Sequence, residues 1–207
     1  MDWQKLLLGI VSINIQTLTP EASIISKATK LNLHFQLLPI FTKNILHMCA
    51  TTTKNEFMQE AIRLSIENVT SGQGGPFGAV IVKDGKIIAR GANQVTSSND
   101  PTAHAEVVAI RNACKELGSF QLDGCEIYTS CEPCPMCLGA IYWARPDKMY
   151  FANTKKDAAD IQFDDQFIYE EMEIPYTNRK LETVQMMREE ALEAFKIWSD
   201  SINKIEY

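Results

Sequence analysis

Residues 100–110 read DPTAHAEVVAI and change from a turn-forming sequence to an apolar pattern with helical spacing. His104 and Glu106 stand at the start of this predicted helix. A second segment, SCEPCPMCLGAI, carries Cys134 and Cys137 behind prolines, which are tolerated in the first turn of a helix. Because residues at i and i+3 lie on the same helical face, both cysteines point the same way. The sequence therefore predicts two helix starts that carry an imidazole, a carboxylate and two thiols.

The imidazole and the two thiols are ligand types that zinc prefers, and three protein ligands leave a fourth tetrahedral position open for water. An open position is typical of catalytic zinc, and Glu106 follows His104 closely enough to act as the base for that water. Helix N-termini also stabilise thiolates by lowering the pKa of cysteine. A single histidine or a single C-x-x-C more often belongs to a cap or a buried core. The joint pattern instead indicates a zinc site formed by His104, Cys134 and Cys137.

Cys131 forms a further C-x-x-C pair with Cys134 and is an alternative ligand in this region. A fourth sulfur would close the coordination sphere and leave no position for water. Because Cys131 ends a predicted strand before the prolines redirect the chain, we expect it to stay outside the zinc site.

The composition is that of a soluble globular protein, with 45% hydrophobic and 22% charged residues. The formal net charge of −6 argues against binding to a nucleic-acid backbone, which requires a basic surface. No apolar run approaches the length of about twenty residues that a membrane span needs, so no membrane association is expected. Unpaired cysteines that serve as metal ligands favour a reducing compartment, and we predict a cytoplasmic protein.

The first 50 residues differ from the rest in composition, since Asp2 and Glu21 are their only acidic residues and arginine is absent. They resemble a signal peptide only loosely, and the lack of arginine argues against a mitochondrial transit peptide. We predict a poorly defined and poorly ordered N-terminal extension over residues 1–50. A single zinc-dependent domain follows over residues 51–207, with a C-terminal helix and tail over residues 187–207.

Hydrophobic spacing and turn residues divide this domain into alternating helices and strands. An Asp-Gly turn at residues 84–85 predicts a hairpin, and Gly118 predicts a helix end. Strands that alternate with helices form a central sheet covered by helices. The predicted order is a helix over 55–69, strands on either side of the 84–85 turn, a helix over 103–118, a strand over 125–130, a helix over 133–144, a strand over 148–153, a candidate fifth strand over 181–187 and an amphipathic helix over 189–204.

The order H-x-E and then P-C-x-x-C resembles the signature of zinc-dependent nucleoside and nucleobase deaminases. The segments GGPFGAVIVKDG, NDPTAHAEVVAIR, YTSCEPCPMCLGAIYWARP and FDDQFIY together resemble bacterial-type guanine deaminases. The resemblance runs from about Asn55 to the chain end KIEY and leaves out the first 50 residues. The zinc motifs belong to the whole superfamily, whereas the FDD segment and the terminal Tyr207 point to guanine. The resemblance implies an α/β fold, a three-layer α/β/α cytidine-deaminase-like sandwich with a central mixed five-stranded sheet flanked by helices.

The reaction implied by this resemblance is the hydrolytic deamination of guanine to xanthine and ammonia. One zinc ion per subunit would be held by His104, Cys134 and Cys137, and zinc-bound hydroxide would attack C2 of the ring. Glu106 would shuttle the proton from that water to a ring nitrogen and then to the leaving amine. The implied substrate class is a small purine base.

The resemblance also assigns residues to substrate binding. Asp165 would bind the amine and assist proton transfer, Asn93 would offer a donor and an acceptor to the purine edge, and Phe77 would stack on the base. The backbone of Ala105 and the terminal Tyr207 would complete the pocket. Ordinary structural roles stay open for three of them: core packing for Phe77, a turn for Asn93 and a helix cap for Asp165.

In guanine deaminases of this type the C-terminal segment is swapped between subunits, which implies a homodimer with Tyr207 at the partner's site. Guanosine deaminases share much of the motif set, although a ribose needs the room that the tail would fill. A tRNA adenosine deaminase needs a basic face, and cytosine or cytidine deaminases are weaker alternatives. An inactive zinc-stabilised scaffold belongs to a different class, but the zinc motifs and Glu106 are all present.

Overall fold

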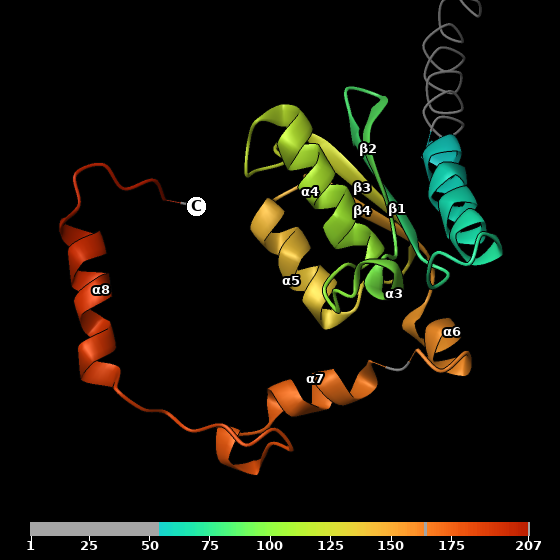
Figure 1. The fold of residues 1–207 in the computed structure, drawn as a ribbon. Coiled ribbons are helices and arrows are strands. Elements are labelled where there is room, and N and C mark those ends of the chain that lie inside the picture. The colour runs from blue at the N-terminus through green and yellow to red at the C-terminus, as the bar shows by residue number, and fades with distance from the viewer. Residues whose placement is uncertain (1–53, 164, 207) are drawn as a thin grey trace, which may run out of the picture. The chain divides into compact units, whose positions relative to one another are not determined.

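The computed structural model describes residues 54–163 and 165–206 of the chain (Figure 1). The extension predicted over residues 1–50 lies outside the described residues, and so does Tyr207. Within the described ranges, every helix falls short of the length and apolar character that a membrane span requires. Residues 54–70 are helical, in agreement with the helix predicted over 55–69.

The first two strands form the predicted hairpin. β1 (Gly78–Lys83) and β2 (Lys86–Ala92) are antiparallel and are joined by Asp84 and Gly85. Both turn residues have positive φ, 50° and 70°, which matches the twist of a two-residue hairpin turn. This backbone requirement explains the Asp-Gly sequence at the turn.

The sheet has the order β2-β1-β3-β4 in the described residues. β3 (Cys125–Cys131) runs antiparallel to β1, and β4 (Lys148–Asn153) runs parallel to β3. α4 (Ala105–Leu117) connects β2 to β3, and α5 (Pro135–Ala144) provides the crossover that the parallel pair requires. The predicted mixed sheet flanked by helices is thus confirmed, with four strands in place of five.

The prediction of a fifth strand over residues 181–187 was wrong, because this segment forms no strand. Its apolar residues are exposed, with 77% of Leu181, 71% of Val184 and 74% of Met186 accessible. A segment with strand-forming residues becomes a strand only where a sheet edge pairs with it. Among the described strands, β4 keeps one edge unpaired. Residues 181–187 therefore do not pair with the open edge of β4 within the described chain.

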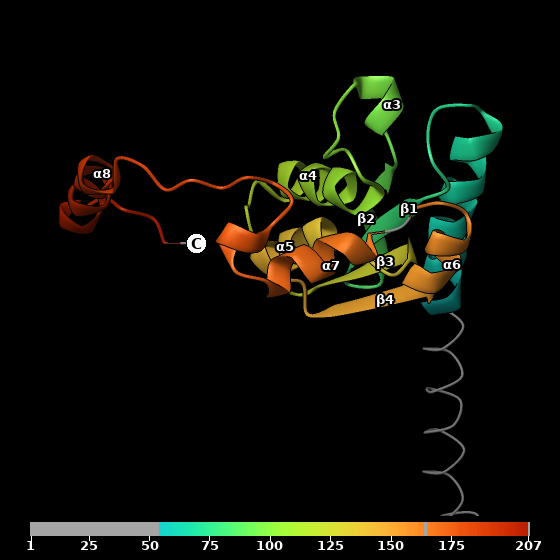
Figure 2. The same cartoon turned by 90° about the horizontal axis from the view of Figure 1, so that it is seen from below.

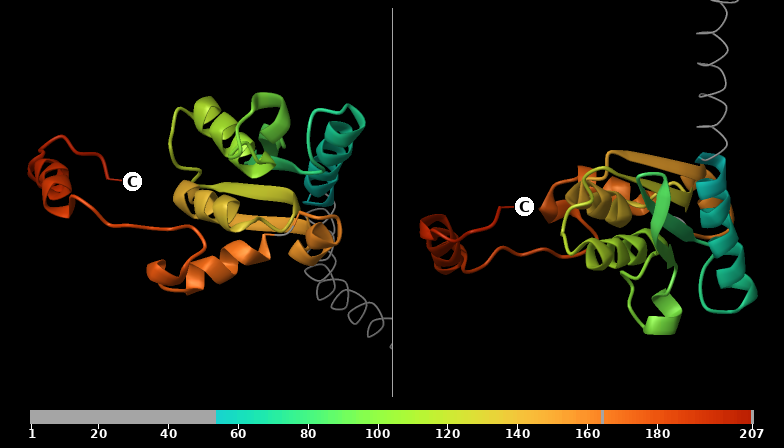
Figure 3. Two further views of the ribbon diagram at one scale, coloured as in Figure 1. Left: turned by 60° about the horizontal axis from the view of Figure 1, so that its bottom comes forward. Right: turned by 90° about the horizontal axis from the view of Figure 1, so that it is seen from above.

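Alternate residues of β1 supply two different cores, one on each face of the sheet. Ala79 and Ile81 pack with buried side chains of α4 and α5. Val80 and Val82 pack with the helix over residues 54–70. Figures 2 and 3 show the sheet with α4 and α5 on one side and this helix on the other. The predicted three layers therefore arise from the period-two pattern of a central strand.

Two glycines let these helices approach the sheet closely. A Cβ atom at Gly91 would lie 2.2 Å from the carbonyl oxygen of Ala105, at the start of α4. A Cβ atom at Gly78 would lie 2.3 Å from the carbonyl oxygen of Ala61 in the helix over 54–70. Neither strand can hold a larger residue there without displacing the helix. Gly91 thus allows α4 to begin close against β2, and Gly78 allows the helix over 54–70 to pack closely on β1.

The remaining chain forms a predicted final helix and several short elements that the sequence analysis missed. α8 (Arg188–Asp200) agrees with the helix predicted over 189–204. None of its side chains is buried, and 72% of Phe195, 64% of Ile197 and 47% of Trp198 are exposed. The elements that were not predicted are α3 (Val95–Ser98), α6 (Lys155–Asp160), α7 (Gln166–Glu173) and the 3-10 turn η1 (Tyr176–Asn178).

Glu60 ties the helix over 54–70 to β2, since its carboxylate accepts hydrogen bonds from Arg63 at 2.8 Å and from Arg90 at 2.6 Å. These two guanidinium groups lower the pKa of Glu60 to about 2 from an ordinary value of 4.5. Because the pKa in the folded protein is the lower one, the stabilisation is fully present above pH 4.5. It disappears as the pH falls towards 2.

We expect Glu60→Gln to lower the free energy of unfolding by about 1 kcal/mol near neutral pH, with a difference from wild type that shrinks as the solution is acidified. Glu67→Gln is the matched control, because Glu67 forms an exposed ion pair with Arg63 inside the same helix. Denaturant unfolding of the three proteins at several pH values measures both losses. Equal losses for the two variants would contradict a bridge between Glu60 and β2.

Candidate metal centre

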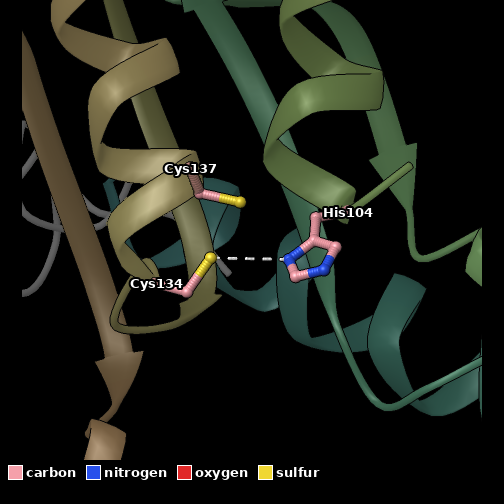
Figure 4. A group of neighbouring side chains, drawn as sticks. All are labelled: His104, Cys134 and Cys137. Carbon is pink, nitrogen blue, oxygen red and sulfur yellow. Dashed lines mark hydrogen bonds between the residues drawn. The ribbon is translucent and has the colours of Figure 1, made fainter. Parts of the chain in front are cut away.

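Two helices carry the predicted zinc ligands at their starts. His104 is the N-cap of α4 and Cys134 is the N-cap of α5, and both have the extended backbone of N-cap residues. Pro135 fills the first position of α5, where a missing N–H costs no helical hydrogen bond. Cys137 follows three residues after Cys134 on the same helical face. The three side chains therefore converge between the two helices (Figure 4).

The distances between the donor atoms fit a tetrahedral zinc ion. The donor atoms of His104, Cys134 and Cys137 all lie within 4.8 Å of one another. Nδ1 of His104 is 3.6 Å from Sγ of Cys134. Zinc bonds of about 2.3 Å to sulfur and about 2.0 Å to nitrogen separate two tetrahedral ligands by roughly 3.6 Å. One imidazole and two thiols also match the donor types of catalytic zinc, so the residues present fit this metal.

Hydrogen bonds among the donors favour a thiolate. The pKa of Cys134 is lowered to about 4, chiefly by its contact with the neighbouring Cys137 thiol and next by its hydrogen bond with His104. The same contact raises the pKa of Cys137 far above its ordinary value, and burial adds to the rise. The hydrogen bond to Cys134 also raises the pKa of His104. One sulfur is thus ready to bind a cation, and metal binding would displace the proton of the second.

Cys131 lies outside this group of donors, as predicted. It is 4% exposed, and its Sγ lies 3.6 Å from the carbonyl oxygen of Thr154. Burial raises the pKa of Cys131 to about 11, so it is a thiol at neutral pH. The described structure therefore gives no support to a closed site with a fourth sulfur.

Glu106 lies beside the ligands on the first turn of α4. Only 5% of the residue is exposed, and its Oε2 accepts a hydrogen bond from Sγ of Cys137 at 3.4 Å. Oγ1 of Thr129 on β3, a contact that the sequence analysis missed, lies 3.3 Å from Oε1. Burial raises the pKa of Glu106 above its ordinary value. A buried carboxyl group with a raised pKa is suited to accept and release a proton during catalysis.

The ligands open into a cavity of about 430 Å³, a size that suits a small organic molecule. Its lining brings together predicted residues from distant parts of the chain: Phe77, Asn93, His104, Glu106, Cys134 and Asp165. Asp165 is the N-cap residue of α7, and its charge helps to raise the pKa of His104. Ala105 is fully buried and does not line the cavity. The predicted contact of Tyr207 lies outside the described residues.

Phe77 meets Phe163 edge to face on the cavity wall, with ring centroids 5.0 Å apart and ring planes at 89°. Phe77 also packs against the core between the sheet and α4 and α5. It therefore belongs to the core and to the cavity wall at once. Phe163 was missed as a site residue, although it directly precedes the acid pair that the sequence analysis singled out.

The amide of Asn93 is already engaged on its oxygen side. The residue is 6% exposed, and Oδ1 accepts hydrogen bonds from the N–H groups of Gly75 at 3.4 Å and of Val95 at 3.3 Å. An amide oxygen has two lone pairs, so these contacts use its capacity as an acceptor. The expected acceptor function is thus taken up by the backbone, and the Nδ2 donor is the group left for a ligand in the cavity.

The metal centre is shared with known deaminases. The family model of the cytidine and deoxycytidylate deaminase zinc-binding region matches residues 51–153. A guanine deaminase of Bacillus subtilis (strain 168) is 58% identical over 151 residues, which are 73% of this chain and 97% of that protein. This chain belongs to the guanine deaminase family. Within that family, His104, Cys134 and Cys137 form its zinc site.

This chain also has the fold of a guanine deaminase of known structure. The X-ray structure of guanine deaminase from Bacillus subtilis has a TM-score of 0.72 and 57% sequence identity, and the match covers 74% of this chain and 98% of that chain. A tRNA-specific adenosine deaminase of Aquifex aeolicus (strain VF5) is 42% identical over 50% of this chain and 68% of that protein. The similarity to the guanine deaminase thus extends over more of the chain.

We expect Cys134→Ser to weaken zinc binding by at least about a hundredfold, because a serine hydroxyl replaces a thiolate ligand. Cys131→Ser is the matched control, since it removes a buried thiol three residues away without touching the donor group. Zinc content after dialysis against a chelator series measures both. Loss of zinc from the Cys131→Ser protein would show that Cys131 is a fourth ligand.

Proposed function

We propose that this protein catalyses the zinc-dependent hydrolysis of guanine to xanthine and ammonia. The observation that carries the proposal is Glu106, whose buried carboxylate lies 3.4 Å from a zinc ligand and lines the same cavity. A purely structural zinc site has four protein ligands and needs no such group. Membership of the guanine deaminase family supports guanine as the substrate.

The proposed proton transfers depend on Glu106. When bound, zinc supplies a Lewis acid that activates water at the open coordination position. Glu106 takes the proton of the attacking water and passes it to the ring nitrogen beside C2. Glu106 then takes the remaining proton from the hydroxyl group added at C2 and passes it to the amine, which leaves as ammonia while the C2 carbonyl forms. The raised pKa of Glu106 supports this sequence, because in each transfer the carboxyl must hold a proton between taking it up and releasing it.

Three cavity residues support recognition of a purine base. The carboxylate of Asp165 is suited to accept from the exocyclic amine of guanine, and Nδ2 of Asn93 is suited to donate to a ring acceptor. Phe77, with Phe163 against its edge, offers an apolar wall to a planar ring. Ala105 is fully buried and lies outside the cavity lining, so the predicted backbone contact with the ring is not part of this proposal.

We also propose a homodimer that exchanges its C-terminal segments. Two features of the described chain support it: the strand-like residues 181–187 are exposed, and α8 carries an exposed Phe195 and Trp198. Soluble monomers rarely leave large apolar patches in water. A second copy could pair residues 181–187 with the open edge of β4 and cover α8. The tail would then carry Tyr207 to the partner's cavity and leave no room for the ribose of guanosine, the nearest alternative substrate.

Glu106→Gln should lower kcat for guanine by at least about a hundredfold, because a glutamine amide cannot carry the proton. Zinc content and thermal unfolding should stay close to wild type. Glu132→Gln should retain most activity, although Glu132 lines the same cavity, because its carboxylate is engaged by the N–H of Lys155 at 3.0 Å. Ammonia release from guanine, guanosine and cytosine measures activity and substrate choice. A wild type that does not turn over guanine would overturn the proposed function.

Coexpression of two inactive chains tests the exchange of C-terminal segments. One chain carries Glu106→Gln with an intact tail, and the other ends at Asp200 and so lacks Tyr207. If the tail acts in the partner, each mixed dimer has one complete site. Activity should then recover to about a quarter of wild type, since about half of the dimers are mixed. Activity no higher than the sum of the separate chains would show that the tail serves its own subunit.

A further inference from the structure

Asn68 lies behind the cavity wall and joins two of its segments. It stands in the last turn of the helix over 54–70 and is 7% exposed. Its Nδ2 donates to the carbonyl oxygen of Gly75 at 2.8 Å and to that of Asn93 at 2.9 Å. An amide nitrogen carries two hydrogens, so both are used. The orientation of the amide is determined, because a flipped amide would set its oxygen against two carbonyl oxygens.

The segments that Asn68 joins are also bonded to each other. The N–H of Phe77 donates to the carbonyl oxygen of Gly75 at 2.8 Å, and the N–H of Asn93 donates to that of Phe77 at 3.1 Å. The N–H of Gly75 donates to Oδ1 of Asn93 at 3.4 Å. Asn68, Gly75, Phe77 and Asn93 therefore form a closed network, called here the Asn68 clasp. Apart from Asn68, its members line the cavity.

The Asn68 clasp is packed too tightly to rearrange easily. A Cβ atom at Gly74 would lie 2.3 Å from the carbonyl oxygen of Asn93 and 2.9 Å from Nδ2 of Asn68. Any side chain at this glycine would therefore push the two halves of the clasp apart. At such a tightly packed position, a buried carbonyl oxygen that loses its hydrogen-bond donor is left unsatisfied, which costs free energy.

We propose that Asn68 is a positioning residue for substrate binding. By fixing the backbone of Gly75 and Asn93, it holds Oδ1 of Asn93 on the backbone and leaves Nδ2 for an acceptor atom of the substrate ring. An amide that is oriented before the substrate arrives loses less freedom on binding. The inference rests on the proposed guanine deaminase activity and deepens it. Because Asn68 does not line the cavity, its effect reaches the substrate through Asn93.

Asn68→Asp is the sharpest test, since it keeps the shape of the side chain but sets a carboxylate oxygen against two carbonyl oxygens. The KM for guanine should rise by roughly tenfold or more, while kcat should stay within about twofold of wild type. This split is expected because the clasp affects ring binding in the ground state and the transition state alike, whereas Glu106 is untouched. Zinc content should be unchanged.

Ser65→Ala is the matched control, because Ser65 is 8% exposed in the same helix and its hydroxyl donates to the carbonyl oxygen of Ile62 within that helix. Its KM should equal that of wild type even if its thermal stability falls. Should Asn68→Asp fail to fold, Gly74→Ala opens the clasp from the other side and should raise KM in the same way.

The outcomes separate the clasp from the proposed function. Wild-type turnover of guanine with an unchanged KM in the folded Asn68→Asp or Gly74→Ala protein would overturn the role of the Asn68 clasp alone. An equal rise of KM in Ser65→Ala would also overturn it, because general loosening of the helix would then explain the effect. A wild type without guanine turnover would overturn the proposed function and the role of the clasp with it.

Discussion

The site depends on the meeting of two helix N-termini. α4 and α5 each begin with a ligand residue, so the first-turn N–H groups and the positive ends of two helix dipoles surround the donor atoms. This arrangement favours a thiolate at Cys134. It also requires α4 to lie close against β2, which the absent side chain of Gly91 permits. The packing of α4 against β2 therefore determines where its first residues, and with them the ligand His104, are placed in the metal centre.

Environment distinguishes the carboxyl groups of the cavity. Glu106 is buried beside a zinc ligand, and the loss of hydration favours its protonated form. Asp165 stands at the start of α7, is only partly buried, and acts on His104 through its charge. Such unlike surroundings are consistent with the unlike tasks proposed for them, proton transfer for Glu106 and substrate contact for Asp165. Neither task depends on the residue type alone.

The order of elements in the domain could be predicted because its signals are local. The Asp-Gly hairpin and the helix end at Gly118 each need only a few neighbouring residues. The fifth strand could not be predicted in the same way. The apolar residues of segment 181–187 are compatible with a strand, but local sequence does not specify the sheet edge that would pair with it. α6 and α7 were missed because they are short, with 6 and 8 residues, so that few positions are available to indicate a helix.

The sequence by itself indicated the zinc ligands and the proposed catalytic base of this protein. His104, Cys134 and Cys137 were indicated by their donor types and by the i,i+3 spacing of the cysteines, and Glu106 by its place two residues after His104. Only the tertiary structure decided what surrounds them. Thr129 reaches Glu106 across 23 residues of chain, and Asn68 reaches Asn93 across 25. Which atom of Asn93 is left for the cavity depends on such contacts, because packing between distant segments and not local spacing orients a buried amide.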